Sequence, residues 1–564
     1  MLKFFFPNNM NSKKRAFNSL FIKVILITLC FLRFFYLDQD VPSYMISGIS
    51  QEDESYYSIG AVLRYFSDLG LTDPKYNTTA ADPVCLYSTP LTYLSFHVFG
   101  NNYWGLRFSV PVLSLLVIFF LYKSAKNKLQ TNLTSINFLL FLLVTDFYFF
   151  TVSRYQNPQL YSLLIISFCM FCFYKVHDIN KKIFLVTFFS VSSVLFIYVY
   201  NIFFVFGALF YFLILGFIKK DFKVLLYLIF GGLASFLIFI ITLQIMGLTI
   251  FDYVKIFTDF NEKRNAISVE TEMGIVNAIF SAIKNASSIL FTNLFRYNLI
   301  WLLFFIYGII YRIHLIFKNG LKLMNTDFLF FIMICAFIQA AFLNSYPFKK
   351  WVVLLPVMYC FGIEFFKKFS LVDSKKLLIA VFFLVPISFY SYKINYSINY
   401  WSGFNYGYYE NVPIFISLIP LFTVLIFVVS IIFYFKSHLK SWIYFFCITL
   451  NVIISVNVFF LNKKFELRDY LLKLKPQLEN QYLIDGFPHA YCIYSNAIPI
   501  LNPYSHNYKE DTYSSLMLSK KDKKKYFLVK EMRNKSQKII YNSNFTLLEK
   551  KYFKFYNLIL YEYN

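Results

Sequence analysis

Solid blocks of about 20 apolar residues recur along the chain, and they constrain the fold more than any other feature of the sequence. A block of this length crosses the hydrocarbon core of a bilayer as one α-helix. A soluble protein would instead show apolar residues in periodic stripes and about 25% charged residues. Here only 15% are charged. The sequence therefore predicts an all-α protein that crosses a membrane many times.

The apolar blocks predict thirteen membrane-spanning helices. The first block follows Lys13, Lys14 and Arg15 and is too long for the apolar region of a signal peptide. We interpret it as a retained helix whose N-terminus lies inside. The predicted spans are 18–38, 105–123, 132–152, 157–176, 181–200, 202–218, 222–246, 296–317, 326–345, 350–366, 375–391, 412–434 and 441–461.

Basic residues alternate with these spans and predict their orientation. Short loops expected inside are rich in Lys and Arg, whereas the short outside connections hold few. This pattern accounts for the net charge of +24, which in a soluble protein would suggest nucleic-acid binding. An odd number of spans then puts the C-terminus outside. The inside loops carry Lys123, Lys126, Lys128, Lys175, Lys181, Lys182, Lys219, Lys220, Lys223, Arg312, Lys318, Lys322, Lys367, Lys368, Lys375, Lys376, Lys436 and Lys440.

Three predicted outer segments, 39–104, 247–295 and 392–411, are long, and loops of this length are usually functional. The first ends in a short apolar stretch, Leu91 to Phe99, which is too short to span and is expected to lie along the membrane interface. The hydropathy falls after residue 462. We therefore expect a transmembrane domain over 1–462 and a small extracytoplasmic α/β domain over 463–564.

The C-terminal domain shows helical and strand patterns in turn. Residues 466–479 predict a helix that places four apolar side chains on one face, and short segments rich in β-forming residues follow. The four side chains are Leu467, Tyr470, Leu471 and Leu474. The predicted strands are 491–494, 526–529, 539–541 and 558–561.

Cysteine usage gives little support for metal or redox chemistry. Six of the eight cysteines lie in apolar blocks, where Cys behaves as a small hydrophobe, and these include the pair Cys169 and Cys172. Cys85 and Cys492 lie in polar segments, where a disulfide and two free thiols are both open alternatives. The sequence contains no nucleotide-binding glycine motif and no zinc-ligand spacing.

The densest polar cluster outside is Gln51-Glu52-Asp53-Glu54-Ser55-Tyr56-Tyr57. Three consecutive carboxylates repel one another, which raises the pKa of at least one carboxyl or favours a bound cation. At a membrane surface such a cluster can act as a general base or hold a divalent metal through its oxygens. The alternative is a helix start capped by Ser50 with acids in its first turn, and both interpretations can hold together.

Several short motifs then follow in a fixed order. They are the pair Asp53-Glu54, the dipeptide Pro90-Leu91, the turn Phe99-Gly100, Arg107 at a helix start, the segment Ser153 to Pro158, and Phe348-Lys349-Lys350-Trp351 with Leu355-Pro356. This order and the thirteen-helix topology resemble the lipid-dependent glycosyltransferases of the GT-C superfamily. The most similar group is glycosyltransferase family 39, which includes the protein O-mannosyltransferases and the lipid A aminoarabinose transferase. The resemblance covers most of residues 18–365.

The resemblance implies an active site between the first outer loop and the outer ends of the helices. Asp53 would be the catalytic carboxylate, with Glu54 beside it in the same role, and Tyr57 and Asn157 would be supporting residues. Asp53 would deprotonate the acceptor or help to hold a divalent metal cation, and the resemblance implies no other cofactor. The departing phosphate needs positive charge. The candidates are Lys349, Lys350, Arg64 and Arg154, for each of which interfacial anchoring is the alternative.

Two features depart from the family pattern. Many relatives carry a second acid after the Arg that precedes the fourth helix, whereas this chain has Asn157 and Gln159, which cannot serve as strong bases or anionic ligands. Asp146, near the outer end of the third helix, is a candidate to compensate, and a snorkelling interfacial group is the alternative. Ser88 stands where the family has a basic residue before Pro-Leu.

The sequence therefore predicts a hexosyl- or pentosyltransferase of the cell envelope. It would move a sugar from a polyprenyl-phosphate donor to a glycan, lipid or protein on the outer face of a bacterial inner membrane, as in lipopolysaccharide or protein glycosylation, without a nucleic-acid partner. A transporter or flippase is one alternative, but it would need charged residues within several spans, and few occur. A polysaccharide polymerase or ligase is another, but the late loop 392–411 lacks the Arg it would need.

Overall fold

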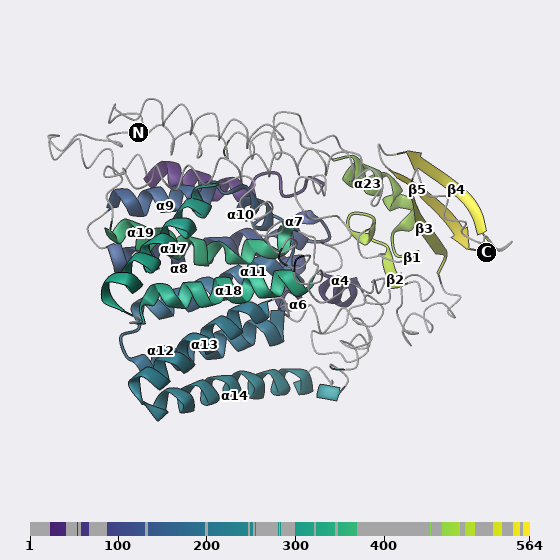
Figure 1. The fold of residues 1–564 in the computed structure, drawn as a ribbon. Helices are drawn as coiled ribbons and strands as arrows, with labels where there is room; N and C mark the ends of the chain where they lie inside the picture. The colour runs from purple at the N-terminus through teal and green to yellow at the C-terminus, as the bar shows by residue number, and fades with distance from the viewer. Residues whose placement is uncertain are drawn as a thin grey trace, which may run out of the picture.

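The structure is a computed structural model that describes most of the helical core and of the C-terminal domain (Figure 1). The predicted spans 375–391, 412–434 and 441–461 and the segments 247–295 and 392–411 lie outside the described residues, apart from a few single positions. The described residues are 23–40, 54, 58–66, 87–129, 133–197, 201–245, 249–251, 254, 280, 283, 299–320, 323–343, 348–368, 452, 465–485, 491–501, 523–532, 545–552 and 556–563.

Long helices form the larger part of the molecule, and shorter ones lie at one end of them (Figure 1). The short elements are η1 (Leu32–Phe34), α4 (Ile59–Phe66), α6 (Thr89–Phe99), α7 (Tyr103–Arg107), α10 (Phe147–Val152), the π-helix η3 (Ser193–Ile197) and η6 (Phe348–Leu354). The longer helices are α8 (Ser109–Leu129), α9 (Leu133–Thr145), α11 (Pro158–Lys175), α12 (Ile179–Ser192), α13 (Ile202–Lys219), α14 (Phe222–Ile245), α17 (Leu299–Asn319), α18 (Asn325–Leu343) and α19 (Leu355–Lys368).

Five helical stretches of the described residues are long and apolar enough to cross a membrane, and two shorter apolar helices accompany them. The predicted class, a polytopic all-α membrane protein, is confirmed. The five stretches are Tyr103–Leu129, Pro158–Lys175, Ile179–Ile197, Ile202–Lys219 and Phe222–Ile245. The shorter pair are Ser135–Thr145 and Asn325–Ala341.

Several predicted spans are not continuous α-helices. The predicted helix 181–200 continues from α12 into the π-helix η3, and two other spans are interrupted. The predicted helix 132–152 breaks at Asp146, which leaves helical geometry (φ −59°, ψ 125°) and caps α10 by accepting a hydrogen bond from the Phe149 N–H. The predicted helix 350–366 begins as the tighter η6 and becomes α-helical at Leu355. These two interruptions concern the same end of the helices, where α10 and η6 pack together.

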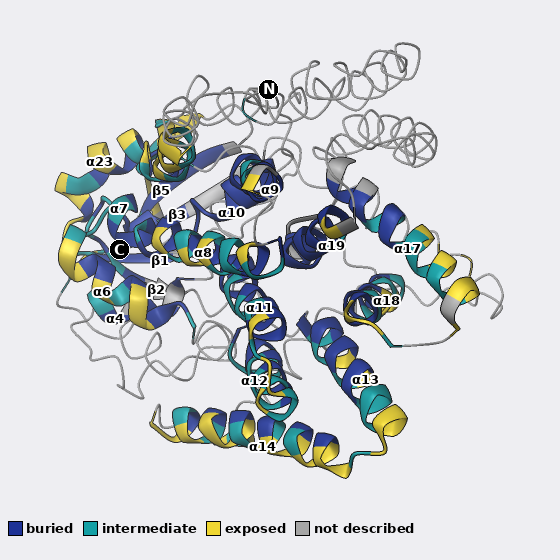
Figure 2. Cartoon of the chain, turned by 90° about the vertical axis from the view of Figure 1, so that its left-hand side faces the viewer, coloured by how far each residue is buried: buried dark blue, intermediate teal, exposed yellow. Residues whose placement is uncertain are grey.

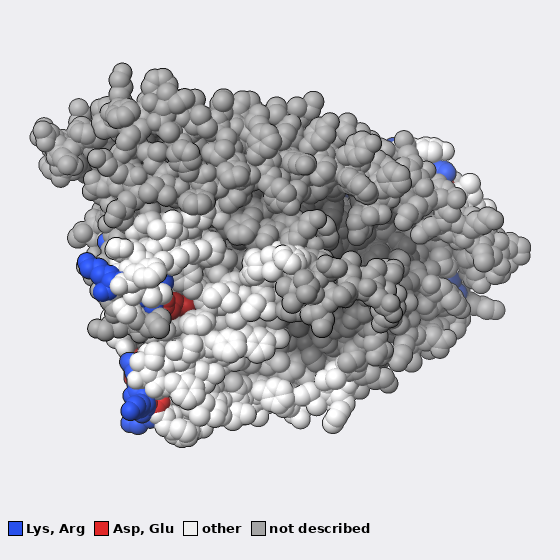
Figure 3. Space-filling model, viewed as in Figure 1, with Lys and Arg blue, Asp and Glu red and all other residues white. Residues whose placement is uncertain are grey.

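Basic residues gather at the opposite end of the helical bundle. Figure 3 shows Lys and Arg gathered at the end farthest from the C-terminal sheet. Those predicted inside loops that the structure describes meet there, because α8, α11, α13, α17 and α19 finish at this end and α9, α12, α14 and α18 begin there. Lys128, Lys175, Lys219 and Lys367 lie in or near these last turns. The structure therefore groups the basic loops as expected, and their assignment to the cytoplasm stays a prediction.

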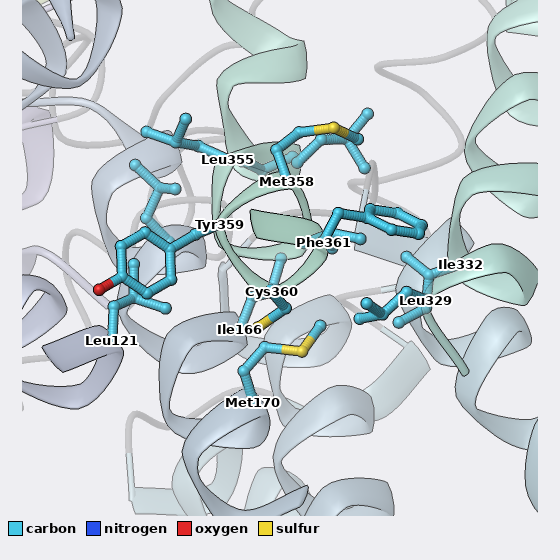
Figure 4. Packing of buried hydrophobic residues seen from close by; sticks show 14 of the residues in the cluster. Leu121, Ile166, Met170, Leu329, Ile332, Leu355, Met358, Tyr359, Cys360 and Phe361 are labelled. Carbon is cyan, nitrogen blue, oxygen red and sulfur yellow. The ribbon is translucent and has the colours of Figure 1, made fainter. Parts of the chain in front are cut away.

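A continuous apolar core fills the middle of the bundle. Figure 4 shows Tyr359, Cys360 and Phe361 of α19 packed against side chains of α8, α11 and α18. The neighbours include Leu121, Ile166, Met170, Leu329 and Ile332, all with no exposed surface. Helix α19 is thus buried on nearly every side, although it is short.

Helix α14 lies at the edge of the bundle and presents a broad apolar face outward (Figure 2). Leu233 is 58% exposed and Phe230 is 55% exposed, whereas Gly231 and Ser235 pack inward. An apolar face of this size is unfavourable in water but suits contact with lipid tails. This helix supports the membrane assignment independently of the hydropathy of the sequence.

The C-terminal domain contains α23 (Glu466–Leu478) packed on a five-stranded sheet of order β2-β1-β3-β5-β4. The strands are β1 (Tyr482–Asp485), β2 (Ile498–Leu501), β3 (Lys525–Met532), β4 (Phe545–Tyr552) and β5 (Tyr556–Tyr563). Pairs β1–β2 and β1–β3 are parallel, and β3–β5 and β4–β5 are antiparallel. The predicted α23 is confirmed with its four apolar residues buried, as are two strands, which correspond to β3 and β5.

The predicted strand 491–494 is wrong. These residues form a helical turn in which Ser495 donates a hydrogen bond to the Tyr491 carbonyl, and Tyr494 and Asn496 adopt positive φ. Side-chain packing overrides the β-forming tendency here, because Ile493 is buried against α4, α6 and α7. The predicted strand 539–541 and the boundary between the two domains lie outside the described residues.

Candidate functional site

The centre of the candidate site is a buried ion pair between the first predicted outer loop and α7. Arg107 donates from Nε to Glu54 Oε1 over 2.7 Å and from Nη2 to Glu54 Oε2 over 2.6 Å. Neither side chain has exposed surface. A bidentate guanidinium–carboxylate pair is the geometry that best offsets the cost of burying two charges. It fixes Glu54, and with it the chain next to Asp53, against the start of a long helix.

The remaining donors of Arg107 hold the chain that leaves the first helix. Nη1 donates to the carbonyls of Leu37 and Gln39, each over 2.5 Å. The guanidinium also lies 4.1 Å from the ring centre of Tyr103 and 4.7 Å from that of Tyr155. Cation–π contacts of this kind stabilise a charge that water cannot reach. Arg107 therefore joins four separate parts of the chain.

The turn between α10 and α11 also contributes hydrogen bonds around Glu54. The Gln156 N–H donates to Glu54 Oε1 over 3.0 Å, and the Gln156 side chain donates to Thr92 Oγ1 of α6. Asn157 caps α11 by accepting from the Leu160 N–H, and its amide donates to the carbonyls of Val152 and Tyr155. The predicted supporting residue Asn157 is thus bound within the turn, where its capping holds Gln156 toward Glu54.

Arg154 was predicted to bind donor phosphate, and the structure places it against main-chain carbonyls. Its Nη1 donates to the carbonyls of Leu32 and Arg33, and its Nη2 donates to those of Phe35 and Tyr36. The side chain has no exposed surface. This geometry favours a role in holding the end of the first helix. The phosphate contact stays a prediction.

Asp146 is buried at the break between α9 and α10. Its Oδ1 accepts from the Phe149 N–H over 3.0 Å, and its Oδ2 accepts from Trp301 Nε1 of α17 over 3.1 Å. Its side chain is nearly inaccessible, which excludes the snorkelling alternative within this structure. Both oxygens have protein partners, so Asp146 is built into the wall of the site.

Gln159 is a buried polar residue at this end whose whole side-chain amide lacks hydrogen-bond partners among the described residues. It is wholly buried in the first turn of α11, and neither its amide oxygen nor its amide nitrogen has a hydrogen-bond partner among the described residues. The indole N–H of Trp351, in η6, is in the same condition. Helix α11 packs against η6, so both orphaned groups belong to one region. Buried polar groups are normally paired, and such exceptions often mark ligand contacts.

The structure describes some of the remaining predicted site residues and not others. Arg64 is wholly buried in α4 and donates from Nη1 to the Gly60 carbonyl over 3.0 Å. Lys349 and Lys350 lie in η6, whose backbone is described while these two side chains are not. Asp53 and Tyr57 lie outside the described residues, as does Cys85, so the disulfide alternative also stays a prediction.

Sequence reasoning assigned no site role to Arg107, Tyr155 or Gln156. The role of Arg107 could have been suspected from the sequence, since a basic residue at the start of an apolar span needs a charged partner once it is buried. Glu54 lies 53 residues earlier in the chain, and nothing local links the two residues. Gln156 contributes its backbone N–H to Glu54, a contact that side-chain identity does not encode.

The described residues do not form a site for a divalent cation. They contain no group of three or more His, Cys, Asp and Glu side chains that could hold a metal ion. Both oxygens of Glu54 and both of Asp146 accept hydrogen bonds from protein donors, and amides stand at 157 and 159. A cation would depend on Asp53 and on other residues outside the described part of the chain. We therefore derive no chemical step through a metal.

The sequence matches one family model over residues 87–244, a region that runs from α6 to the end of α14. That family is described as dolichyl-phosphate-mannose-protein mannosyltransferase. The matched region contains Arg107, the turn 153–157 and Gln159. A search of curated protein sequences finds no match.

The fold is similar to solved structures of ArnT from Cupriavidus metallidurans. The structure of that protein bound to undecaprenyl phosphate aligns with a TM-score of 0.56 and 10% sequence identity, over 96% of this chain and 97% of that one. The apo structure aligns with a TM-score of 0.54 and 11% identity, over 98% of each chain. At this identity the likeness shows a shared fold over nearly the whole length of both chains.

Proposed function

We propose that this chain is a membrane glycosyltransferase of the GT-C superfamily that uses a polyprenyl-phosphate sugar, a proposal that the family match over residues 87–244 and the shared fold both support. The observation that carries the proposal is the buried Glu54–Arg107 pair, which fixes the acidic loop against the turn before α11. Asp53 precedes Glu54 directly in the sequence. The similar ArnT structure contains bound undecaprenyl phosphate, which supports a lipid donor of this class.

In the proposed reaction, Asp53 accepts the proton of an acceptor hydroxyl or amine. The acceptor atom forms a bond to the anomeric carbon of the donor sugar as the bond from that carbon to the phosphate oxygen breaks. The electron pair leaves with polyprenyl phosphate, whose developing charge needs nearby cations. Lys349 and Lys350 are our candidates, because η6 packs against α10 and α11 beside the candidate site.

Glu54 takes a different role from the one expected from its position beside Asp53. Its two oxygens accept three hydrogen bonds, from Arg107 and from the Gln156 backbone. Because the side chain has no exposed surface and both oxygens already bind protein donors, Glu54 does not present an oxygen to a substrate hydroxyl in this arrangement. We propose that Glu54 positions the loop and that Asp53 performs the chemistry.

The distribution of charge favours a surface enzyme over a transporter. The described charged side chains lie near helix ends, and the middle of the bundle is apolar (Figure 4). A polar substrate carried across the bilayer would need charged or polar groups along its path. We place the reaction on the outer face of a bacterial inner membrane, with a glycan, a lipid or a protein of the cell envelope as acceptor.

Gln159 provides a test that separates function from stability. Leu at this position removes a buried amide without partners among the described residues, so we expect the free energy of unfolding to stay equal or rise by about 1–3 kcal/mol. We propose that the amide contacts the donor, so sugar transfer should fall about tenfold or more when that hydrogen bond is removed. Thermal unfolding in detergent and a transfer assay measure the two effects.

The neighbouring amide supplies the matched control. Asn157→Ala removes the cap of α11 and should lower the free energy of unfolding by about 1 kcal/mol. If Gln159→Leu instead lost stability and kept its transfer rate, Gln159 would be a packing residue and not a donor contact.

The proposal as a whole is tested by reconstituting the purified protein in liposomes with a radiolabelled polyprenyl-phosphate sugar and an envelope extract as acceptor. We expect the label to become covalently attached to acceptor material, with release of unlabelled polyprenyl phosphate. Movement of intact labelled lipid between leaflets without any covalent transfer would instead establish the flippase alternative.

A further inference from the structure

The C-terminal domain contacts the helical bundle at residues 37–40, the segment whose carbonyls accept hydrogen bonds from Arg107. The carboxylate of Asp40 accepts hydrogen bonds from the backbone N–H groups of Leu467 over 2.9 Å and of Arg468 over 3.1 Å. Arg468 also donates to Asp38 over 2.6 Å. The helix's own N-cap residue, Phe465, makes no side-chain capping bond. Asp40 therefore caps α23 from 427 residues away, and it complements the positive end of the helix dipole.

A second contact joins the turn 491–496 to α6 and α7. The Asn101 amide donates to the Cys492 carbonyl over 3.0 Å and to the Asn496 side chain over 2.6 Å. The ring of Tyr494 meets that of Tyr103 edge-on, with the centroids 5.0 Å apart. In Figure 1 the short helices α4, α6 and α7 lie between the long helices and the C-terminal sheet. The turn is specialised for this contact, since Tyr494 and Asn496 both adopt the disfavoured positive φ.

Both contacts involve residues that lie next to, or themselves bind, Arg107 of the candidate site. Arg107 donates to the carbonyls of Leu37 and Gln39, which alternate along the chain with Asp38 and Asp40. Tyr103, which packs on Tyr494, is also the ring closest to the Arg107 guanidinium. The C-terminal domain thus contacts the surroundings of Arg107 on two sides.

From this arrangement we infer that the C-terminal domain is a positioning element of the active site, and that Asp40 is its positioning residue. When α23 docks on Asp40, the carbonyls of Leu37 and Gln39 are held at Arg107. Arg107 in turn holds Glu54 beside the Gln156 backbone. The consequence for catalysis rests on the proposed function, whereas the mechanical coupling from Asp40 to Glu54 does not.

The coupling is tested on the full-length protein by hydrogen exchange at the Gln156 amide, whose N–H bonds to Glu54. In Asp40→Ala we expect this amide to exchange faster than in wild type, although it lies far from residue 40 in sequence. Lys473→Ala is the matched control. It removes an exposed ion pair with Glu549 inside the C-terminal domain and should leave the Gln156 amide unchanged. Unchanged exchange in Asp40→Ala would overturn the inference, whatever reaction the protein performs.

The catalytic consequence is tested separately by the transfer rate per folded molecule. We expect kcat to fall about 10²-fold in Asp40→Ala with little change in the KM for the lipid donor, because Asp40 acts on geometry and not on donor binding. Asp40→Asn, which keeps one amide oxygen as an acceptor, should lose less. Faster exchange with an unchanged kcat would limit the domain to a structural role.

The pH dependence of stability gives a further readout. Burial raises the pKa of the Asp40 carboxyl to about 6, against the lowering influence of the two N–H bonds and of Arg107 and Arg468. Because the folded state then binds this proton more tightly than the unfolded chain, the stability that protonated Asp40 contributes should be present near pH 4 and be lost as the pH rises through about 6. Tyr103 also interacts with this carboxyl, and Asp38 and Asp469 bind the neighbouring Arg468. The comparison is therefore made with Asp40→Asn, which should lack this part of the pH dependence of stability.

Discussion

Glu54→Ala is expected to lower the free energy of unfolding by about 3–5 kcal/mol, the largest stability change that we anticipate for a single substitution in this chain. The reason is the charge left on Arg107, which has no exposed surface and would lose its only bidentate partner. The Gln156 N–H would also lose its acceptor. Unfolding by heat or by denaturing detergent, followed by circular dichroism, measures this change.

An exposed ion pair provides the control. Lys524→Ala removes the contact with Glu562 in the C-terminal sheet, where the lysine side chain is 66% exposed, and should change the free energy of unfolding very little. If Glu54→Ala unfolded at the same temperature as Lys524→Ala, the Glu54–Arg107 pair would not hold the loop.

A double replacement separates the structural cost from the functional one. Glu54→Gln with Arg107→Met removes both buried charges and keeps an oxygen acceptor for the Gln156 N–H. Much of the lost stability should return, because an apolar side chain avoids the cost of burying an unpaired guanidinium. Transfer should stay lost, since nothing then binds the carbonyls of Leu37 and Gln39. A fully active double variant would show that the pair serves stability alone.

The membrane helices were the most predictable part of the fold, because a bilayer requires long unbroken apolar segments. The same rule hid the break at Asp146. A continuous apolar block around one acid predicts one long helix, whereas the side chain of Asp146 ends α9 and begins α10. The partner that fixes its other oxygen, Trp301, lies 155 residues away. The sequence around Asp146 therefore could not predict that contact.

The candidate site was predictable in its residue types and less so in its roles. The acidic loop, the Arg at the start of a span and the amides at 157 and 159 were all visible as residues in a familiar order. Their roles depend on pairing in space. Arg154 binds four carbonyls of the first helix, and Glu54 has both oxygens occupied, so neither is free for the chemistry that its position in the order suggested. Distinguishing Asn157, a cap, from Gln159, an orphaned amide, likewise required coordinates.

Asp53→Asn is expected to have the largest effect on activity, a loss of about 10²–10⁴-fold in kcat. Asparagine has nearly the same size as aspartate but cannot accept a proton as a strong base. Stability should change little in comparison with Glu54→Ala, because the proposal gives Asp53 the chemistry and Glu54 the structural bond. The adjacent acid supplies a control, since Glu52→Gln alters the same charged segment and should keep transfer within about twofold of wild type.

The central claim is that the carboxylate of Asp53 accepts the proton in a sugar transfer from a lipid phosphate. The most direct measurement is single-turnover transfer of label from a polyprenyl-phosphate sugar in liposomes, with wild type, Glu52→Gln and Asp53→Asn compared at equal amounts of folded protein. We expect rapid transfer by wild type and by Glu52→Gln, and almost none by Asp53→Asn. Transfer by Asp53→Asn at the wild-type rate would contradict this claim.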